Sequence, residues 1–165
     1  MPEEFTLHEE TERTDALVAE LAELWERSVR ATHDFLAEGG VEFYKPFVVE
    51  AIKCLPLVIT ARADGEAAAF MGITGAHLDA LFAAPEYFGR GAGAALMREA
   101  LARGVRSVDV NEQNPRSEQR HMLYSQKNKR GTYEMKHVIL LLATRDTTKI
   151  AAWRSLNCLK TTRGR

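Results

Sequence analysis

Three segments rich in apolar residues follow one another closely between residues 57 and 83. The first two, residues 57–63 and 67–73, are separated by Asp64-Gly65, a dipeptide typical of a two-residue hairpin turn. Residues 77–83 follow after another short connection. Parallel strands need a connection of about a dozen residues or more, so this spacing predicts an antiparallel meander of three strands.

Helical patterns precede the three strands. Apolar residues recur at helical spacing from Leu17 to Phe35, after a good N-cap at Thr14 or Asp15, and predict an amphipathic helix of about 20 residues ending near Gly39-Gly40. A second, shorter helix is expected over residues 43–51, because Phe43, Phe47, Val48 and Ala51 share one face. Pro46 is compatible with that helix only if it falls in the first turn.

A glycine-rich stretch follows the third strand and precedes a segment, residues 94–103, composed of strong helix formers. Gly89, Gly91 and Gly93 lack β-carbons, so the backbone N–H groups between strand and helix can close on the oxygens of a phosphate. A glycine-rich loop of this kind is either an anion cradle or merely a tight turn. Gly104 ends the helix and residues 105–110 predict a further strand.

The loop differs from two familiar nucleotide-binding motifs. A P-loop ends in Gly-Lys-Ser/Thr, whereas the residues here are Gly93-Ala94-Ala95, so a P-loop is excluded. A dinucleotide fingerprint requires a parallel strand–helix–strand unit with an acid about 20 residues on. Asp109 stands near that distance, but the antiparallel meander before the loop disfavours a nucleotide-redox function.

Charge is distributed unevenly along the 165 residues, although the net charge is only −1. Residues 1–115 hold 20 acids and 10 bases, a net of −10, whereas residues 116–165 hold 3 acids and 12 bases, a net of +9. The N-terminus has no basic and apolar leader, and the longest apolar run, residues 138–143, is too short for a membrane span. Cys54 and Cys158 lie far apart without metal-ligand spacing. We therefore expect a cytoplasmic protein without a metal or membrane partner.

The segment from Leu78 to Met97 carries a resemblance to a known family. It resembles the central motif of the GCN5-related N-acetyltransferases (GNAT), Q/R-x-x-G-x-G/A after a strand and a proline turn. Residues 28–36 and 108–115 resemble a bacterial subgroup of that family, the YjaB-like acetyltransferases. The resemblance covers about residues 5–115, and the three motifs occur in the family's order.

This resemblance implies an α/β (α+β) GNAT fold: a mixed, mostly antiparallel sheet, flanked by helices and splayed between its fourth and fifth strands. It further implies acetyl-CoA as cosubstrate, bound in the splay without a metal. The amide arm of the cofactor would pair with backbone at Leu81, Phe82 and Ala83. Its pyrophosphate would lie on the loop and helix start, at Gly89, Arg90, Gly91, Ala92, Gly93 and Ala94.

Acetyl transfer to an amine needs a base for the ammonium and an acid for the leaving thiolate. His77 stands just before the cofactor strand and suits the base role, because imidazole changes protonation near neutral pH; the alternative is a strand-end histidine bonded to backbone. Thr32 and His33 fall where the subgroup lines its acceptor pocket, although His33 also suits a cation at a helix C-terminus. Cys54 lies far from the motif along the chain, so direct attack in a ternary complex is expected.

Two positions depart from the family pattern. Phe88 stands at the leading Gln or Arg position of the motif, so that side-chain contact to the phosphates is absent. Arg90 either supplies the cationic charge instead or points into solvent. The subgroup's tyrosine acid follows an Asn-Pro pair by about seven residues. Asn114 matches that pair and is expected near the cofactor, but Tyr124 stands two residues late, a rotation of about 200° on a helix. Tyr124 is therefore the acid only if its helix starts later.

The family pattern stops after Asn114-Pro115, which divides the chain into an acetyl-CoA-binding core, residues 1–115, and a basic segment, residues 116–165. That segment either completes the sheet with residues 138–143, or is a foreign tail from a frameshift or fusion, or is an interaction segment. Nucleic acid is a disfavoured partner because no aromatic-interleaved basic patch is present. The predicted activity is N-acetylation of a small-molecule or protein amine, by a monomer or homodimer; the alternative is a catalytically impaired relic that binds CoA weakly or not at all.

Overall fold

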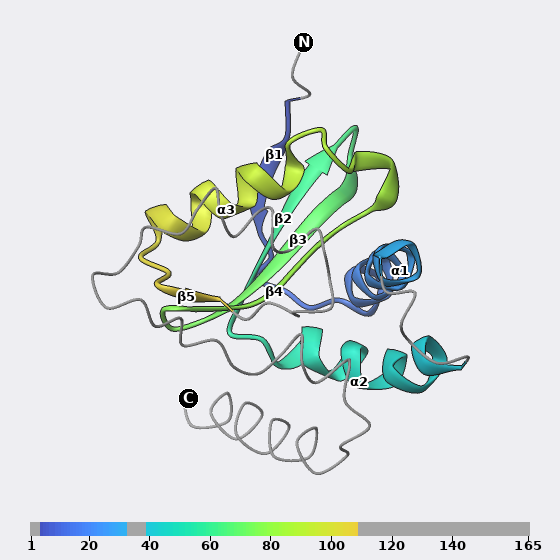
Figure 1. Ribbon diagram of the computed structural model, residues 1–165. Coiled ribbons are helices and arrows are strands. Elements are labelled where there is room, and N and C mark those ends of the chain that lie inside the picture. Colours follow the sequence, from blue (N-terminus) through green and yellow to red (C-terminus); the bar gives the residue numbers. More distant parts are fainter. Residues whose placement is uncertain (1–3, 33–38, 109–165) are drawn as a thin grey trace, which may run out of the picture.

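The computed structural model describes residues 4–32 and 39–108, which form a five-stranded sheet with helices on both faces (Figure 1). The strand order is β1-β2-β3-β4-β5, the same as the order along the chain. The first four strands pair antiparallel, and β5 pairs parallel to β4. The strands span Thr6–Glu9 (β1), Leu57–Ala63 (β2), Glu66–Thr74 (β3), His77–Ala83 (β4) and Ser107–Val108 (β5).

The predicted meander of β2, β3 and β4 is confirmed. Asp64 and Gly65 have φ angles of 51° and 87°, the positive values that a type I′ hairpin turn requires at both central positions. The register between β3 and β4 shifts by one residue at Gly72/Ile73, because Ile73 pairs with Leu78 whereas Gly72 pairs with Ala80. Asp79 is consequently the extra residue of a β-bulge.

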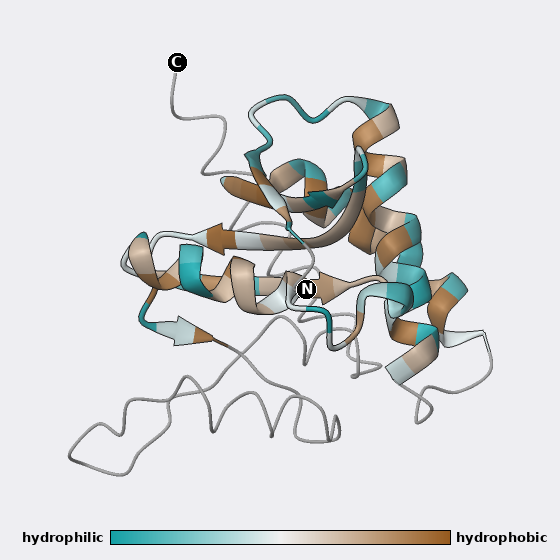
Figure 2. Ribbon diagram, turned by 90° about the horizontal axis from the view of Figure 1, so that it is seen from above, coloured by the Kyte–Doolittle hydropathy of each residue, from teal (hydrophilic) through white to brown (hydrophobic). Residues whose placement is uncertain are grey.

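The two faces of the sheet bury separate cores. Helices α1 (Asp15–Thr32) and α2 (Gly40–Cys54) cover one face, where Trp25 and Phe70 are buried among aliphatic side chains. Helix α3 (Ala92–Ala102) covers the other face, where Leu96 packs with Met71. Figure 2 shows hydrophilic and hydrophobic residues alternating along α1, as expected of an amphipathic helix with one buried stripe.

The start of α1 agrees with its predicted N-cap. The Thr14 side chain accepts a hydrogen bond from the Leu17 N–H at 3.2 Å, and the Thr14 carbonyl accepts one from Val18 at 2.9 Å. These bonds satisfy backbone donors that the first helical turn would otherwise leave without a partner.

The expectation for the second helix was wrong in length and in the place of its proline. Helix α2 begins at Gly40, so Pro46 lies in the second turn rather than the first. A proline there removes a backbone hydrogen bond and crowds the preceding turn. Burial of Val41, Tyr44, Val48 and Ile52 against the sheet and α1 offsets that local cost.

Strand β1 was missed by the sequence pattern, because its four residues are all exposed and carry no apolar alternation. It is held by pairing with β2, from Thr6 opposite Arg62 to Glu9 opposite Ile59. Helix α3 begins at Ala92, two residues earlier than predicted. The strand predicted over residues 105–110 begins two residues later than expected, at Ser107, and residues 109–110 lie outside the described residues.

Other predictions fall outside the described residues, namely His33, Asn114, Tyr124 and the whole basic segment 116–165 with its candidate strand 138–143. Within the described ranges, the pairing of β5 with β4 involves His77 and Leu78. No helix among the described residues is long and apolar enough to span a membrane.

Candidate cofactor-binding and acyl-transfer site

The turn that follows β4 leads directly into α3. A single turn of 3₁₀ helix, η1 (Pro85–Tyr87), begins it, and successive backbone bonds continue it: Tyr87 N–H to Ala84 O at 2.9 Å and Phe88 N–H to Pro85 O at 3.1 Å. The Arg90 N–H then donates to Tyr87 O at 3.2 Å. These bonds hold the glycine-rich loop at the carboxyl end of β4, in front of the α3 N-terminus.

Glycine is required in this loop by its backbone conformation. Gly89 and Gly91 have φ angles of 76° and 104°, where a side chain brings strain, and open space surrounds the position of a β-carbon at both. The first N–H of α3 to bond within the helix is that of Ala95, which donates to Gly91 O at 2.9 Å. Gly91 is the N-cap of α3 and offers no side-chain acceptor. The N–H groups of Ala92, Gly93 and Ala94, in the first turn of α3, are therefore directed out of the helix end, as an anion site requires.

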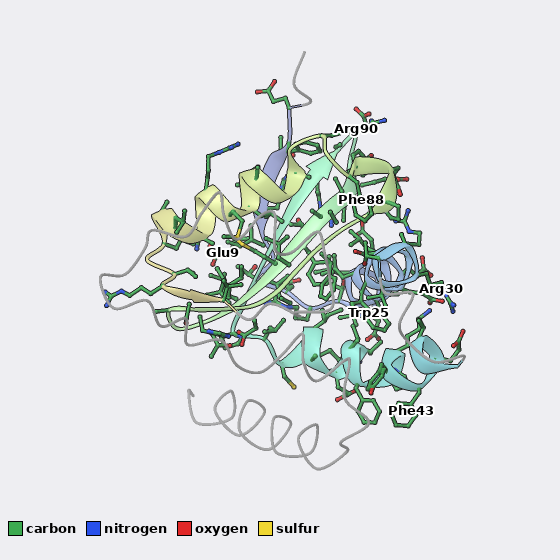
Figure 3. All side chains as sticks on the ribbon, viewed as in Figure 1. Glu9, Trp25, Arg30, Phe43, Phe88 and Arg90 are labelled. Carbon is green, nitrogen blue, oxygen red and sulfur yellow. The ribbon has the colours of Figure 1, made fainter. Side chains whose placement is uncertain are left out.

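Phe88 and Arg90 lie on this same turn, and Figure 3 shows them at one end of the sheet. The Phe88 side chain is half-buried and packs against the core beneath α3. Arg90 is exposed, and its guanidinium carbon lies 5.8 Å from the centre of the Tyr87 ring. The positive charge of the loop is therefore at position 90, with a hydrophobic anchor at position 88.

The end of β4 provides the strand expected to hold the amide arm of a cofactor. Leu81 and Phe82 pair with Met71 and Phe70 of β3, and Phe82 contacts Phe70 with ring centroids 5.7 Å apart. Phe82 and Ala83 are buried, whereas Leu81 is half-buried. The strand is thus fixed on its β3 side by hydrogen bonds and aromatic packing.

His77 begins β4 at its junction with β5. Its ring nitrogen Nδ1 lies 2.7 Å from the Ser107 hydroxyl oxygen, and the two residues face each other in the parallel register. The histidine is half-buried and shares β4 with Leu81, Phe82 and Ala83, the residues expected to hold the amide arm. A hydrogen bond at one ring nitrogen fixes the orientation of the other, which is what a proton-transfer group needs.

Asp79 is a residue of the site region that the sequence reasoning missed. It is 6% exposed and sits at the bulge of β4, two residues from both His77 and Leu81. Burying a carboxylate is costly, so buried acids are candidates for functional roles. An acid in the middle of an otherwise apolar strand was the available signal in the sequence.

Thr32, predicted to line the acceptor pocket, is the last residue of α1. Its hydroxyl donates a hydrogen bond of 2.7 Å to the Ser28 carbonyl one turn earlier. No cluster of three metal-binding side chains occurs in the described ranges 4–32 and 39–108.

Comparisons with known proteins agree with this geometry. No protein-family model matches the chain. A peptidyl-lysine N-acetyltransferase, YjaB of Salmonella typhimurium, is 38% identical over 109 residues, which are 65% of this chain and 70% of that protein. The solution structure of apo YjaB from Escherichia coli superimposes with a TM-score of 0.61 at 31% identity, covering 73% of this chain and 79% of that one.

The chain belongs to the GCN5-related N-acetyltransferase family. The family resemblance stated from the motifs is therefore confirmed, as are the mixed α/β fold and the enzyme class. The PaiA N-acetyltransferase of Thermoplasma acidophilum, solved in complex with coenzyme A, shares the fold at a TM-score of 0.54 and 18% identity, over 72% of this chain and 87% of that one.

The parallel pairing of β4 and β5 differs from what the sequence indicated around the glycine-rich loop. The strands before the loop pair antiparallel, as expected, yet β4, α3 and β5 form the parallel strand–helix–strand unit that a dinucleotide fingerprint also requires. Topology therefore does not argue against a nucleotide-redox function. Membership of the acetyltransferase family does.

Proposed function

We propose that this acetyltransferase moves the acetyl group of acetyl-CoA to a primary amine by direct attack in a ternary complex. The observation that carries the proposal is the left-handed turn at Gly89 and Gly91, which is open at both glycines and leads into the first turn of α3, where the N–H groups of Ala92, Gly93 and Ala94 suit a pyrophosphate. A CoA complex of a family member with the same fold supports the choice of cosubstrate.

The acceptor we propose is a lysine side chain of a protein, with a small-molecule amine as the second candidate. The Salmonella relative is named a peptidyl-lysine N-acetyltransferase, which supports this choice. We propose Thr32 and His33 as residues of the acceptor pocket, a choice supported by the resemblance of residues 28–36 to the subgroup.

Amine attack on the thioester requires a neutral nitrogen. We assign His77 as the base that takes one proton from the ammonium, directly or through water, because its Nδ1 is already held by Ser107. The amine nitrogen then bonds to the acetyl carbon, and the carbon–sulfur bond breaks after the tetrahedral intermediate. The CoA thiolate leaves with the electron pair of that bond and takes up a proton from Tyr124, the proposed donor, while the remaining extra proton on the amide nitrogen passes to water or back to that donor. Asn114 is a proposed neighbour of the cofactor arm.

Binding of acetyl-CoA, measured by calorimetry, is the first test. Gly91→Ala is expected to weaken binding at least tenfold, because a β-carbon at φ 104° displaces the amides at the start of α3. Gly39→Ala is the matched control, since Gly39 is likewise a left-handed N-cap glycine, at φ 79°, but it precedes α2. Equal losses in the two variants, or no binding by the unaltered protein, would contradict the proposed cofactor site.

Thiol release from acetyl-CoA, measured with lysine peptides and with a panel of small amines, tests the reaction. Release with peptides but not with small amines supports a protein acceptor, and the reverse pattern assigns a small-molecule acceptor. Binding without release on either panel identifies the impaired relic instead. Unchanged turnover of a Tyr124→Phe variant would remove Tyr124 as the acid.

A further inference from the structure

Tyr87 connects the glycine-rich turn to the body of the protein. It is the last residue of η1, is half-buried, and packs against both cores, the one beneath α1 and α2 and the one beneath α3. Its ring meets the Phe5 ring edge-on, with centroids 6.0 Å apart and planes at 78°. Phe5 directly precedes β1, so contacts from distant parts of the chain hold the Tyr87 ring.

Arg90 lies over that fixed ring. Its guanidinium carbon is 5.8 Å from the ring centre, within the range of a cation–π interaction, and its backbone N–H donates to the Tyr87 carbonyl. An exposed arginine otherwise samples many rotamers, so stacking on a fixed ring restricts where its charge lies. Arg90 stands between Gly89 and Gly91 in the chain, so its stacked side chain begins on the glycine-rich turn itself.

Arg90 is the basic side chain of the glycine-rich turn that can supply a cationic contact to a phosphate. Phe88 carries no charge and its ring packs into the core, so the motif's usual cationic position supplies none here. The Glu86 carboxylate on the same turn accepts a hydrogen bond from Arg27 of α1. Burial raises the pKa of Glu86, but its backbone hydrogen bond and the Arg27 guanidinium outweigh that and keep the pKa below its ordinary value. Glu86 is therefore ionised and paired with Arg27 at neutral pH.

We propose that Tyr87 is a positioning residue, which holds the Arg90 guanidinium at the glycine-rich turn to receive the pyrophosphate of acetyl-CoA. The inference rests on the proposed cofactor site and adds to it a residue that acts through another. Phe88 stands where the family motif has glutamine or arginine. Arg90, two residues later, supplies the basic group instead, and the Tyr87 ring on which it stacks positions it.

Dissociation constants for CoA, measured by calorimetry on single and double variants, test this proposal. Arg90→Ala is expected to weaken binding about tenfold, the loss of one charge-assisted contact. Tyr87→Leu is expected to weaken it about three- to fivefold, whereas Tyr87→Phe keeps the ring and stays within about twofold. The Tyr87→Leu/Arg90→Ala double variant should bind no worse than Arg90→Ala alone, because Tyr87 acts through Arg90.

Two further variants keep the test decisive if Tyr87→Leu does not fold. Arg90→Lys retains the charge but loses the planar group that stacks, and is expected to weaken binding by about as much as Tyr87→Leu. Arg98→Ala, which removes an exposed arginine roughly two helical turns further along α3, is the matched control and should leave the affinity unchanged.

Several results would overturn the inference. If the fold-losses in CoA affinity of Tyr87→Leu and Arg90→Ala multiply in the double variant, Tyr87 acts by packing alone. A loss in Arg90→Ala with CoA but not with 3′-dephospho-CoA would move the contact to the 3′-phosphate. If the unaltered protein binds CoA and Arg90→Ala binds equally well, the positioning role fails while the proposed function stands; if the unaltered protein does not bind CoA, the proposed function itself fails.

Discussion

The Nδ1 atom of His77 lies 2.7 Å from the Ser107 hydroxyl oxygen, a hydrogen bond that crosses the parallel junction of β4 and β5. The two residues are separated by the whole glycine-rich turn and α3, so the crossover that contains this turn also brings Ser107 to the histidine. The same strand–helix–strand unit, β4–α3–β5, thus orients the proposed base and forms the proposed pyrophosphate site.

Replacement of the proposed base should slow the reaction without removing cosubstrate binding. His77→Gln is expected to lower kcat by about 10²–10⁴-fold, the usual contribution of a positioned base. The measurement is thiol release with a lysine peptide, accompanied by calorimetry to verify acetyl-CoA binding. Asp79→Asn is the comparison, since Asp79 is a buried acid on the same strand. A large loss in Asp79→Asn with little loss in His77→Gln would transfer the base role to Asp79.

Removal of the serine hydroxyl should affect turnover more than affinity. Ser107→Ala is expected to lower kcat roughly three- to tenfold, because the His77 ring loses the bond that orients it but keeps its chemistry. KM for acetyl-CoA should stay within about twofold. Ser107→Thr, which retains a hydroxyl, should recover most of the rate; failure of that rescue, with equal effects on kcat and KM, would indicate a packing role for Ser107.

Glu20 links α1 to the β2–β3 hairpin and is expected to make stability depend on pH. Its carboxylate accepts two hydrogen bonds from Arg62, at 2.9 and 3.0 Å, and one from the Ala67 N–H at 2.9 Å. Burial raises the pKa of Glu20, but these bonds outweigh burial and the pKa lies below its ordinary value. The resulting stabilisation is present above the pKa of the unfolded chain and is lost as pH falls through the folded-state pKa.

Glu20→Gln is therefore expected to lower the free energy of unfolding by about 1 kcal/mol at pH 7, discounted for partial exposure of the side chain. The difference should shrink below about pH 4. Urea unfolding at several pH values measures it, with Glu23→Gln, an exposed acid on the same helix, as the control. A deficit that persists unchanged at low pH would rule out the ionic origin.

Gly72 provides a test of packing between β3 and the chain that follows α2. A β-carbon built at Gly72 lies 2.4 Å from Cδ1 and 3.2 Å from Cγ of Leu55, a side chain that is 6% exposed. Gly72→Ala should therefore lower the free energy of unfolding by about 1 kcal/mol, since Leu55 must move within a packed core.

The double variant Gly72→Ala/Leu55→Val should be less destabilised than the two single changes added together, because the shorter valine makes room for the new methyl group. Urea unfolding of the four proteins gives this coupling. Strict additivity would show that Leu55 is not the residue that excludes a side chain at position 72.

How far the sequence predicted this fold depends on how local each signal is. The meander of β2 to β4 was predictable because Asp64-Gly65 specifies its own turn and the strands on both sides are apolar. Strand β1 was not, since four exposed residues form a strand only because β2 is available to pair with them. Helix α2 extends past Pro46 for the same kind of reason: tertiary burial outweighs a local preference.

The sequence by itself determined the family, the meander and the glycine-rich turn, because these reside in short contiguous patterns whose backbone requirements are local. Only the tertiary structure decided which distant side chains meet: Ser107 at His77, and Phe5 against the ring that carries Arg90. It also decided that Asp79 lies buried at a bulge, since that depends on the register between two strands. Pairing and packing between separate segments follow from the collective burial of both faces of the sheet, which no single stretch of the chain encodes.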